Sequence, residues 1–320
     1  MHDRRRPDTI ARDSADSTPP GSALRGRNAI SRTVRTGVVT MDFSVKAVLG
    51  YRVKQDTPFV FNVQAERFSG QAITSEALHV DPPIPLEHWT MPESGNRYVR
   101  LIAPPGGFKL SYEATVRLTH PTEDPADVHE VPPADLPLSV LTHLYPSRYC
   151  QADRLERFAH RTFGGLPPGH ERVAAICNWI RDNVDYISGA SDALTSAADT
   201  IVQRAGVCRD FAHLGIALSR ALGIPARYVS AFAWRLQPPD FHAVFEAFLR
   251  GPSGPGWYVF DPTRMAAPEG IVRIGIGRDA AEVAFCTQFG EMEFDKPEVS
   301  INGSEDATAS TTRAVRVQDA

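Results

Sequence analysis

The stretch from Ala205 to His213 places a cysteine directly after a turn and at the start of an apolar helix. Gly223 and Pro225 end this helix. In the first turn of a helix, unpaired backbone N–H groups and the positive end of the helix dipole stabilise an anion. Cys208 therefore fits a nucleophile, although a free cysteine considered alone is more often a small buried hydrophobic residue. The apolar residues after it recur at the spacing of an amphipathic helix: Phe211, Leu214, Gly215, Leu218, Ala221 and Leu222.

Length and composition indicate a globular protein with a sizeable core. The chain has 320 residues, enough for about two domains, and its 42% hydrophobic content is ordinary for this class. The formal net charge of −4, without a basic stripe among aromatic residues, argues against a nucleic-acid partner. No apolar run approaches the roughly 20 residues of a membrane span. Because no apolar stretch follows Arg4–Arg6, we expect no secretory signal peptide and a cytoplasmic location.

The cysteines are far apart and form no C-x-x-C pair, so their spacing predicts neither a structural zinc site nor a disulfide framework. In a reducing compartment we expect them to be free thiols. We also expect no metal and no cofactor. The four residues are Cys150, Cys177, Cys208 and Cys286.

Changes in composition and hydrophobic pattern divide the chain into five parts. Residues 1–40 are polar and rich in Arg, Ser and Pro, which predicts a disordered arm. Residues 41–120 contain short β-type runs separated by turn residues, which predicts an antiparallel β-sandwich. Residues 121–146 carry six prolines and predict a linker or strap between domains. Residues 147–296 form the expected catalytic core, and residues 297–320 are expected to be a disordered tail.

Within the expected core, helical periodicity comes first and strand patterns follow. The helical patterns start at about Ser147 and include one after Pro167-Pro168. Helices followed by an antiparallel sheet indicate an α+β fold. The strands are predicted over residues 226–232, 241–249, 257–261 and 271–276.

A catalytic thiol also needs a base, and the base needs a partner that orients it. His242 stands at the start of one predicted strand, and Asp261 ends the next one. A short loop joins these strands as a hairpin, so the two side chains are expected at one edge of the sheet. Each residue alone also has a structural interpretation, a core histidine or an Asp-Pro turn. Together with Cys208 they make the arrangement that a Cys-His-Asp triad requires.

Four motifs in this order resemble the bacterial transglutaminase-like superfamily over roughly residues 147–290. Residues 41–120 also resemble the β-rich domain that often precedes this core. The resemblance implies a papain-like fold in which Cys208 is the nucleophile, His242 the base and Asp261 the orienting residue. Val244 is a departure, because family members commonly have Trp there. The motifs are Gly206-Val207-Cys208-Arg209-Asp210-Phe211-Ala212-His213, Leu222-Gly223-Ile224-Pro225-Ala226-Arg227-Tyr228-Val229, Phe241-His242-Ala243 with Glu246, and Gly256-Trp257 with Phe260-Asp261-Pro262-Thr263.

Acyl transfer needs an oxyanion hole, which stabilises the charge that develops on the carbonyl oxygen. The backbone N–H of Cys208 is one expected donor. For the second donor we predict Gln203, five residues before the cysteine, with Trp179 and Tyr186 as alternatives.

These features predict an enzyme that forms a thioester between Cys208 and a peptide or isopeptide carboxamide. Hydrolysis by water, as in a peptidase or amidase, is the main prediction, because no motif marks a site for an amine. A transglutaminase that uses an amine acceptor is the alternative. A binding or scaffold protein without turnover is an alternative of another class, and the complete triad argues against it. A metal site of Asp210, His213 and His242 is disfavoured, because it would compete with the triad. The expected partner is a peptide or protein substrate.

Overall fold

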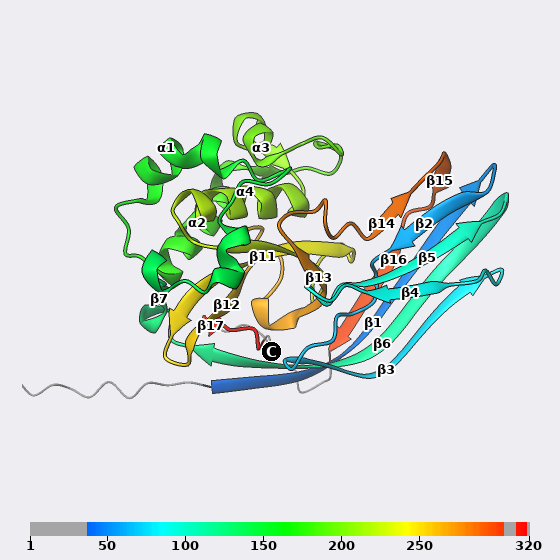
Figure 1. Cartoon of the computed structure of the whole chain (residues 1–320), viewed down its shortest axis with the longest axis horizontal. Coiled ribbons are helices and arrows are strands. Elements are labelled where there is room, and N and C mark those ends of the chain that lie inside the picture. The colour runs from blue at the N-terminus through cyan, green and yellow to red at the C-terminus, as the bar shows by residue number, and fades with distance from the viewer. Residues whose placement is uncertain (1–36, 304–311, 319–320) are drawn as a thin grey trace, which may run out of the picture. The chain divides into compact units, whose positions relative to one another are not determined.

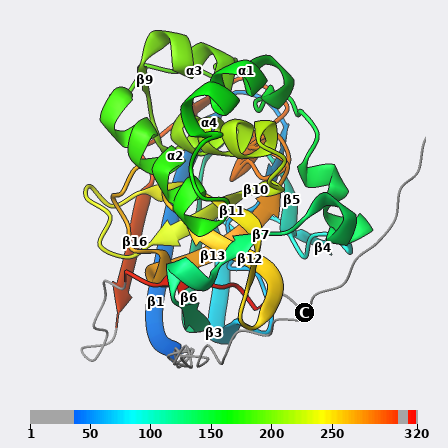
Figure 2. The same cartoon turned by 90° about the vertical axis from the view of Figure 1, so that its left-hand side faces the viewer.

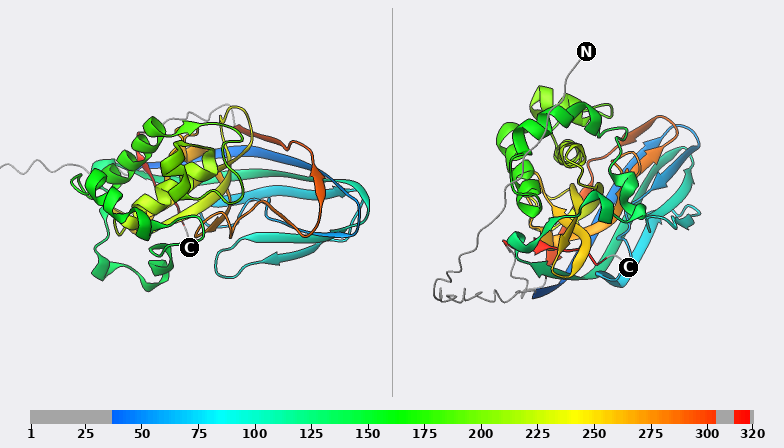
Figure 3. Two further views of the ribbon diagram at one scale, coloured as in Figure 1. Left: turned by 90° about the horizontal axis from the view of Figure 1, so that it is seen from above. Right: turned by 60° about the vertical axis from the view of Figure 1, so that its left-hand side comes forward.

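The computed structural model describes residues 37–303 and 312–318. A layer of helices covers one face of a central antiparallel sheet, and long strands of a second sheet pass beneath it (Figures 1 and 2). Seen from above, the helices overlie the central sheet, while the long strands extend beyond them (Figure 3). The predicted α+β class is confirmed.

Buried residues at helical spacing form the inner face of each long helix. In the second helix, Val173, Ile176, Cys177 and Ile180 are fully buried at i, i+3, i+4 and i+7. None of the described helices has the length and apolar character needed to cross a membrane. The described α-helices are α1 (Ala152–Phe163), α2 (His170–Asn183), α3 (Ala197–Gln203) and α4 (Cys208–Ala221). The 3-10 helices are η1 (Pro125–Asp127), η2 (Pro133–Asp135), η3 (Leu138–His143) and η4 (Pro268–Gly270).

The central sheet lies directly against α4, whose residues from Asp210 to Arg220 are buried. Alternate strand residues, including Tyr228 and Phe245, pack with the helices on this face. The predicted hairpin is present, with Phe245 opposite Phe260. The strand order is β12 (Gly254–Phe260), β11 (Phe241–Gly251), β10 (Ala226–Ala233) and β13 (Ile271–Gly277), and β7 (His129–Glu130) pairs with β11.

Two further antiparallel sheets form the N-terminal β-rich part and enclose an apolar core between them. The first contains β15 (Met292–Phe294), β1 (Gly37–Val53), β6 (Gly106–Glu123) and β17 (Ala314–Val315), with β16 (Glu298–Gly303) paired to β1 and β3 (Gln71–Asp81) paired to β6. The second contains β14 (Cys286–Gln288), β2 (Thr57–Phe61), β5 (Arg97–Ala103) and β4 (Glu87–Thr90). A short parallel pair, β8 (Asp185–Tyr186) and β9 (Ala205–Gly206), lies before α4.

The predicted domain boundaries need three corrections. The first strand begins at Gly37, inside the expected arm, and residues 1–36 lie outside the described residues. The predicted linker continues β6 as far as Glu123 and adds β7 to the central sheet, so it is an ordered strap. Strands β14 and β15 belong to the expected core by sequence, yet they pair with β2 and β1 of the N-terminal sheets.

The expected disordered tail is wrong for its described residues. Residues 298–303 form β16 along β1, and Ala314 and Val315 pair with the end of β6. Val299, Ala314 and Val315 are buried there. A few apolar side chains are therefore enough to order these segments as strands, because an existing strand offers free backbone hydrogen-bonding partners. The other expected tail residues, 304–311 and 319–320, lie outside the described residues.

The N-terminal sheets and the central sheet share one apolar core. The side chains of Phe232 in β10 and of Trp234, just after β10, pack with the strands beneath the central sheet. Phe232 stacks near Tyr112 of β6, and Trp234 meets Phe43 of β1 edge to face. The two parts therefore stabilise each other through direct aromatic contact.

We predict that Phe232→Ala destabilises both parts together. Removing this fully buried ring should cost about 3–5 kcal/mol of unfolding free energy. Denaturant unfolding followed by far-UV circular dichroism and by tryptophan fluorescence should show one shifted transition. The exposed control Ile102→Ala on β5 should change stability by less than about 0.5 kcal/mol. Two separate transitions would contradict the shared core.

Candidate active site

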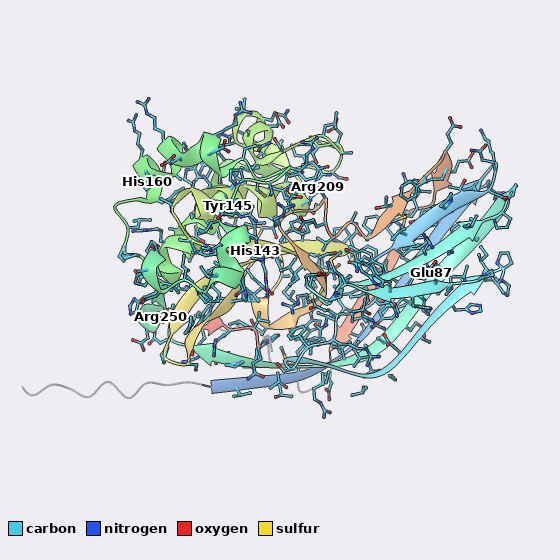
Figure 4. All side chains as sticks on the ribbon, viewed as in Figure 1. Glu87, His143, Tyr145, His160, Arg209 and Arg250 are labelled. Atoms are coloured by element: carbon cyan, nitrogen blue, oxygen red, sulfur yellow. The ribbon has the colours of Figure 1, made fainter. Side chains whose placement is uncertain are left out.

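The structure places Cys208 at the first position of α4, with only Val207 between it and β9. Its side chain is partly exposed, whereas Cys150 and Cys177 are fully buried. Figure 4 labels Arg209, the next residue, at the end of the helical layer. The sequence prediction of a cysteine at a helix start is thus confirmed for Cys208, and it is the most accessible thiol of the three on the helical side.

The buried carboxylate of Asp210 determines how the chain enters α4. Its Oδ2 accepts a hydrogen bond from the backbone N–H of Val207 at 2.9 Å and another from the Ser191 hydroxyl. Its Oδ1 accepts from the Arg209 guanidinium at 2.9 Å. A carboxylate in the first turn also interacts favourably with the helix dipole. Asp210 is therefore a structural anchor for the residue that carries the thiol.

Gly206 is required because this turn is crowded. A Cβ atom added at Gly206 would lie 2.7 Å from the Cβ of Asp210. The same glycine pairs with Tyr186, and its carbonyl accepts the N–H of Ile187 at 2.9 Å. The glycine in the Gly-Val-Cys motif thus lets the backbone approach both the helix and β8.

His242 and Asp261 lie together at one edge of the central sheet, as predicted. The Nε2 of His242 lies 3.1 Å from the Oδ2 of Asp261. Because a carboxylate accepts only, this nitrogen carries the proton and donates. Both side chains are almost fully buried. Asp261 stands one residue after the end of β12, so the predicted strand starts three residues too late and ends one residue too late.

Backbone and side-chain donors from the following turn hold Asp261 in place. Thr263 donates its N–H and its hydroxyl to Oδ1 at 2.8 and 2.7 Å, and the N–H of Ala266 donates to Oδ2 at 2.9 Å. Burial alone would raise the pKa of Asp261, but the hydrogen bonds from His242 and Thr263 outweigh it and lower the pKa. Asp261 is thus a fixed negative charge, and sequence reasoning did not identify the donors that hold it.

The second ring nitrogen of His242 is turned away from Asp261. Within the described residues, this buried Nδ1 has no hydrogen-bond partner that meets standard geometry. The side chain of Cys208 nevertheless interacts with the imidazole. Burial lowers the pKa of His242, but the hydrogen bond to Asp261 and the interaction with Cys208 outweigh burial and raise it above its ordinary value of 6.5. This environment favours the imidazolium form.

The structure does not bring Gln203 to the thiol. Gln203 is exposed at the end of α3, and among the described residues its side chain makes no hydrogen bond to Cys208, His242 or Asp261. Trp179, an alternative oxyanion donor, also does not reach the thiol, since its ring packs against Phe158 and the Arg204 guanidinium.

Tyr186, the other alternative, does reach Cys208. Burial raises the pKa of its phenol, and the backbone N–H and the thiol of Cys208 both interact with its hydroxyl. The ring is 44% exposed and leans on Phe211 of α4. The parallel pairing of β8 with β9 places it there, and a sequence pattern does not reveal such a contact.

His213 lies in the protein interior, where its contacts are those of a core residue. Its Nε2 accepts the N–H of Ala280 at 3.1 Å, and its ring stacks on Tyr149. Burial lowers its pKa to about 3, so the ring is neutral. Within residues 37–303 and 312–318, no group of three or more His, Cys, Asp and Glu residues could hold a metal ion. Asp210, His213 and His242 are therefore not gathered into such a group among these residues.

We predict that Gly206→Ala misplaces Cys208. The new methyl group must push Asp210, which should cost about 1–3 kcal/mol and slow alkylation of Cys208 by iodoacetamide. Site-resolved mass spectrometry measures this rate. The control Gly165→Ala adds a methyl group with no atom within 4 Å and should leave both quantities unchanged. Equal alkylation rates in the two variants would contradict the role of Gly206.

Comparisons with known proteins identify the family and the fold. Residues 156–262 match the transglutaminase-like superfamily, and residues 41–139 match the bacterial transglutaminase N-terminal domain. A crystal structure of a proposed cysteine protease from Cytophaga hutchinsonii is 40% identical, covers 89% of this chain and 100% of its own, and has a TM-score of 0.83.

Two mycobacterial relatives are also similar, and both are uncharacterised proteins. The Mycobacterium leprae protein is 37% identical over 117 residues, which are 35% of this chain and 42% of that protein. The Mycobacterium bovis protein is 28% identical over 229 residues, which are 67% of this chain and 68% of that protein. The chain therefore spans less than half of the Mycobacterium leprae protein that it matches. Motifs, fold and relatives together show that this chain belongs to the transglutaminase-like superfamily.

Proposed function

We propose that this protein is a cysteine-dependent enzyme that hydrolyses peptide or isopeptide bonds through a thioester on Cys208. One observation carries the proposal: His242 donates Nε2–H to the buried Asp261, while its other nitrogen is left for Cys208 at the start of α4. The similarity to the proposed cysteine protease from Cytophaga hutchinsonii supports the same reaction class. Membership of the superfamily supports a cysteine-dependent enzyme in general.

In the proposed reaction, the Cys208 thiolate attacks the carbonyl carbon of the scissile amide and forms a C–S bond. The negative charge moves to the carbonyl oxygen, where the backbone N–H of Cys208 stabilises it. As the C–N bond breaks, the imidazolium of His242 gives the Nδ1 proton to the leaving amine. Water then attacks the thioester and gives a proton to His242, and the carboxylic acid leaves with Cys208 as thiolate.

We propose Tyr186 as the second donor to the carbonyl oxygen in place of Gln203. Its hydroxyl already interacts with the backbone N–H and the thiol of Cys208. A substrate carbonyl that binds at this N–H would displace the phenol oxygen from it. The Tyr186 hydroxyl would then donate a hydrogen bond to the carbonyl oxygen, on which the negative charge develops.

Transfer to an amine is a second candidate, and Asp240 favours it. This exposed residue precedes the strand that carries His242. Its carboxylate interacts electrostatically with both His242 and Tyr186. A negative charge at this position attracts an ammonium group, such as that of a lysine side chain. The same thioester would then end as a new amide.

Trapping the thioester should identify nucleophile and acyl group together. We expect wild-type protein incubated with a glutamine- and lysine-containing peptide library to show an acyl adduct on Cys208 by intact-mass and peptide-mapping spectrometry. Cys208→Ala should show no adduct and no hydrolysis. Added primary amine distinguishes the two candidates, because a transglutaminase yields an amide of that amine. Hydrolysis that persists in Cys208→Ala would contradict the mechanism.

The oxyanion donors can be tested with a matched pair of variants. Tyr186→Phe removes only the hydroxyl and should lower kcat about 100-fold, as expected for the loss of one donor. Gln203→Ala should leave kcat within about twofold of wild type, because its exposed side chain does not contact the triad. A larger effect from Gln203→Ala than from Tyr186→Phe would reverse the assignment.

The charge of Asp261 should set the alkaline limit of activity. The imidazolium of His242 has a raised pKa, so it is present at low pH and is lost as the pH rises through that value. Asp261→Asn removes the charge, and the alkaline limb of kcat/KM should move to lower pH by about one unit or more. Thr263→Ala, which removes one hydrogen bond to Asp261, should move the limb less. An unchanged limb in Asp261→Asn would contradict the role of Asp261.

A further inference from the structure

Two adjoining hollows lie away from the proposed active site. Their volumes are about 1020 and 420 Å³, and none of Cys208, His242 and Asp261 lines either one. Met91 and Tyr98 line both of them. The two hollows therefore form one groove, which we call the strap groove because residues of the ordered strap line its larger part.

The strap groove runs from the central sheet to the outer strands β5 and β4. Trp257 of β12 lines one end, whereas the next residue, Tyr258, packs with the helices on the opposite face of the central sheet. Trp89 of β4 lines the other end. Figure 4 labels His143, which lines the first end, and Glu87, which lines the second. An elongated ligand in this groove would contact both the central sheet and the second N-terminal sheet.

Each arginine that lines the strap groove is paired with a glutamate. The one further carboxylate among the lining residues, that of Glu93, is exposed to solvent. The described lining therefore offers no excess positive charge to an anion, and it favours an uncharged ligand. The pairs are Arg227–Glu246, Arg273–Glu66 and Arg278–Glu282, each with an N–O distance of 2.6 Å, and Arg100–Glu87, with 2.9 Å between Nε and Oε2.

These ion pairs can still form hydrogen bonds with an uncharged ligand. A guanidinium carries several N–H donors and a carboxylate several acceptor sites, so one pair leaves some of each unused. The side chains of the pairs Arg278–Glu282 and Arg100–Glu87 are between 39% and 63% exposed. Ser139 adds an exposed hydroxyl group from η3. Such a mixture of donors and acceptors matches ligand hydroxyl groups, because each hydroxyl both donates and accepts.

Aromatic rings provide flat apolar surfaces along the same groove. The rings of Trp89 and Tyr98 stack with 6.0 Å between their centres, and Trp89 is 55% exposed. At the other end, the guanidinium of Arg227 lies 4.1 Å from the centre of the Trp257 ring, which holds the indole in place. Flat rings beside a few polar groups suit a sugar, whose ring has an apolar C–H face and a rim of hydroxyl groups.

The edge of the central sheet at this groove is not free to pair with a peptide. A peptide that adds to a sheet as a strand needs unpaired N–H and C=O groups at the edge. In the edge strand β13, the N–H and C=O of Arg273 bond with the side chain of Gln71 at 2.7 and 2.8 Å. The N–H and C=O of Ile276 bond with the side chain of Asn96 at 2.9 and 2.8 Å. Recognition in the larger hollow therefore depends on side chains, which favours a sugar over an extended peptide.

We propose that the strap groove binds a neutral oligosaccharide, with sugar rings against Trp257 and Trp89 and hydroxyl groups bonded to the paired arginines and glutamates. A drug-sized ligand usually occupies a pocket of about 300–1,000 Å³. The two hollows together exceed this range, so they suit a chain of several sugar units. Because the groove contains none of the triad residues, the proposal does not depend on the proposed function.

Calorimetric titration of the full chain carrying Cys208→Ala tests the proposal. The probes are three neutral tetramers that differ in linkage or substituent: cellotetraose, maltotetraose and tetra-N-acetylchitotetraose. We expect saturable binding of at least one tetramer, with an affinity that is independent of ionic strength because the ligand is uncharged. The corresponding monosaccharide should bind at least about tenfold more weakly, because it reaches only one of the hollows. Absence of saturable binding for all three tetramers would overturn the proposal.

Two other ligand classes serve as comparisons in the same titration. Tetragalacturonic acid carries a carboxylate on every ring and should bind at least about tenfold more weakly than the best neutral tetramer, because the arginines are already paired and the glutamates repel it. An uncharged N-acetylated tetrapeptide amide of serine, tyrosine and glycine should also bind at least about tenfold more weakly, because the edge of β13 is occupied. The Cys208→Ala change prevents turnover of this peptide by the proposed mechanism. Tighter binding of either comparison ligand would overturn the assignment to a neutral sugar.

Two pairs of variants test whether one ligand spans both hollows. Trp89→Ala removes a ring from the smaller hollow and should weaken binding about tenfold or more, whereas Phe289→Ala removes an exposed ring that lines neither hollow and should not. Arg278→Met removes a guanidinium from the larger hollow and should weaken binding about tenfold, whereas Arg181→Met on α2 should leave it unchanged. All four replaced side chains are exposed, so we expect folding to be retained, and circular dichroism checks this. Weaker binding in only one of Trp89→Ala and Arg278→Met would contradict a ligand that spans the groove.

Discussion

The buried carboxylate of Asp210 is the interaction on which the arrangement of the site depends. It joins the backbone of Val207, the hydroxyl of Ser191 and the guanidinium of Arg209 at the start of α4. These bonds hold the loop before β9 and the helix together, and the crowding around Asp210 explains Gly206. Burying the Asp210 carboxylate without such donors would cost folding free energy. The polar groups that satisfy this carboxylate therefore also fix the position of Cys208.

The central sheet provides the other half of the site through its register. Because Phe245 lies opposite Phe260, the start of β11 and the residue after β12 meet at the same edge. The Nε2 of His242 and the Oδ2 of Asp261 then lie 3.1 Å apart. The donors from Thr263 and Ala266 keep the carboxylate in one orientation. The imidazole of His242 is thus oriented by a sheet strand and by a fixed carboxylate, which limits its motion.

The two faces of this sheet have different surroundings. On the helical face, alternate residues pack with α4 and support the helix that begins at Cys208. On the other face, ion-paired arginines, Trp257 and the ordered strap with η3 surround a cavity. Meanwhile Phe232 and Trp234 pack with β1 and β6, so the N-terminal sheets are part of the same folded unit. The sequence boundaries at 120 and 296 do not divide the molecule, because strands from both sides of them share sheets.

The sequence by itself determined the α+β class, the start of α4 at Cys208 and the relation of His242 to Asp261. These are properties of local periodicity, of turn residues and of a short hairpin, all of which are written in neighbouring residues. Tertiary structure alone decided that Tyr186 rather than Gln203 reaches the thiol, since a parallel pairing between segments about 20 residues apart brings it there. It also decided that residues 298–303 and 314–315 are strands, because their order comes from pairing with β1 and β6. Contacts of this kind depend on the partner surface, which a local pattern does not encode.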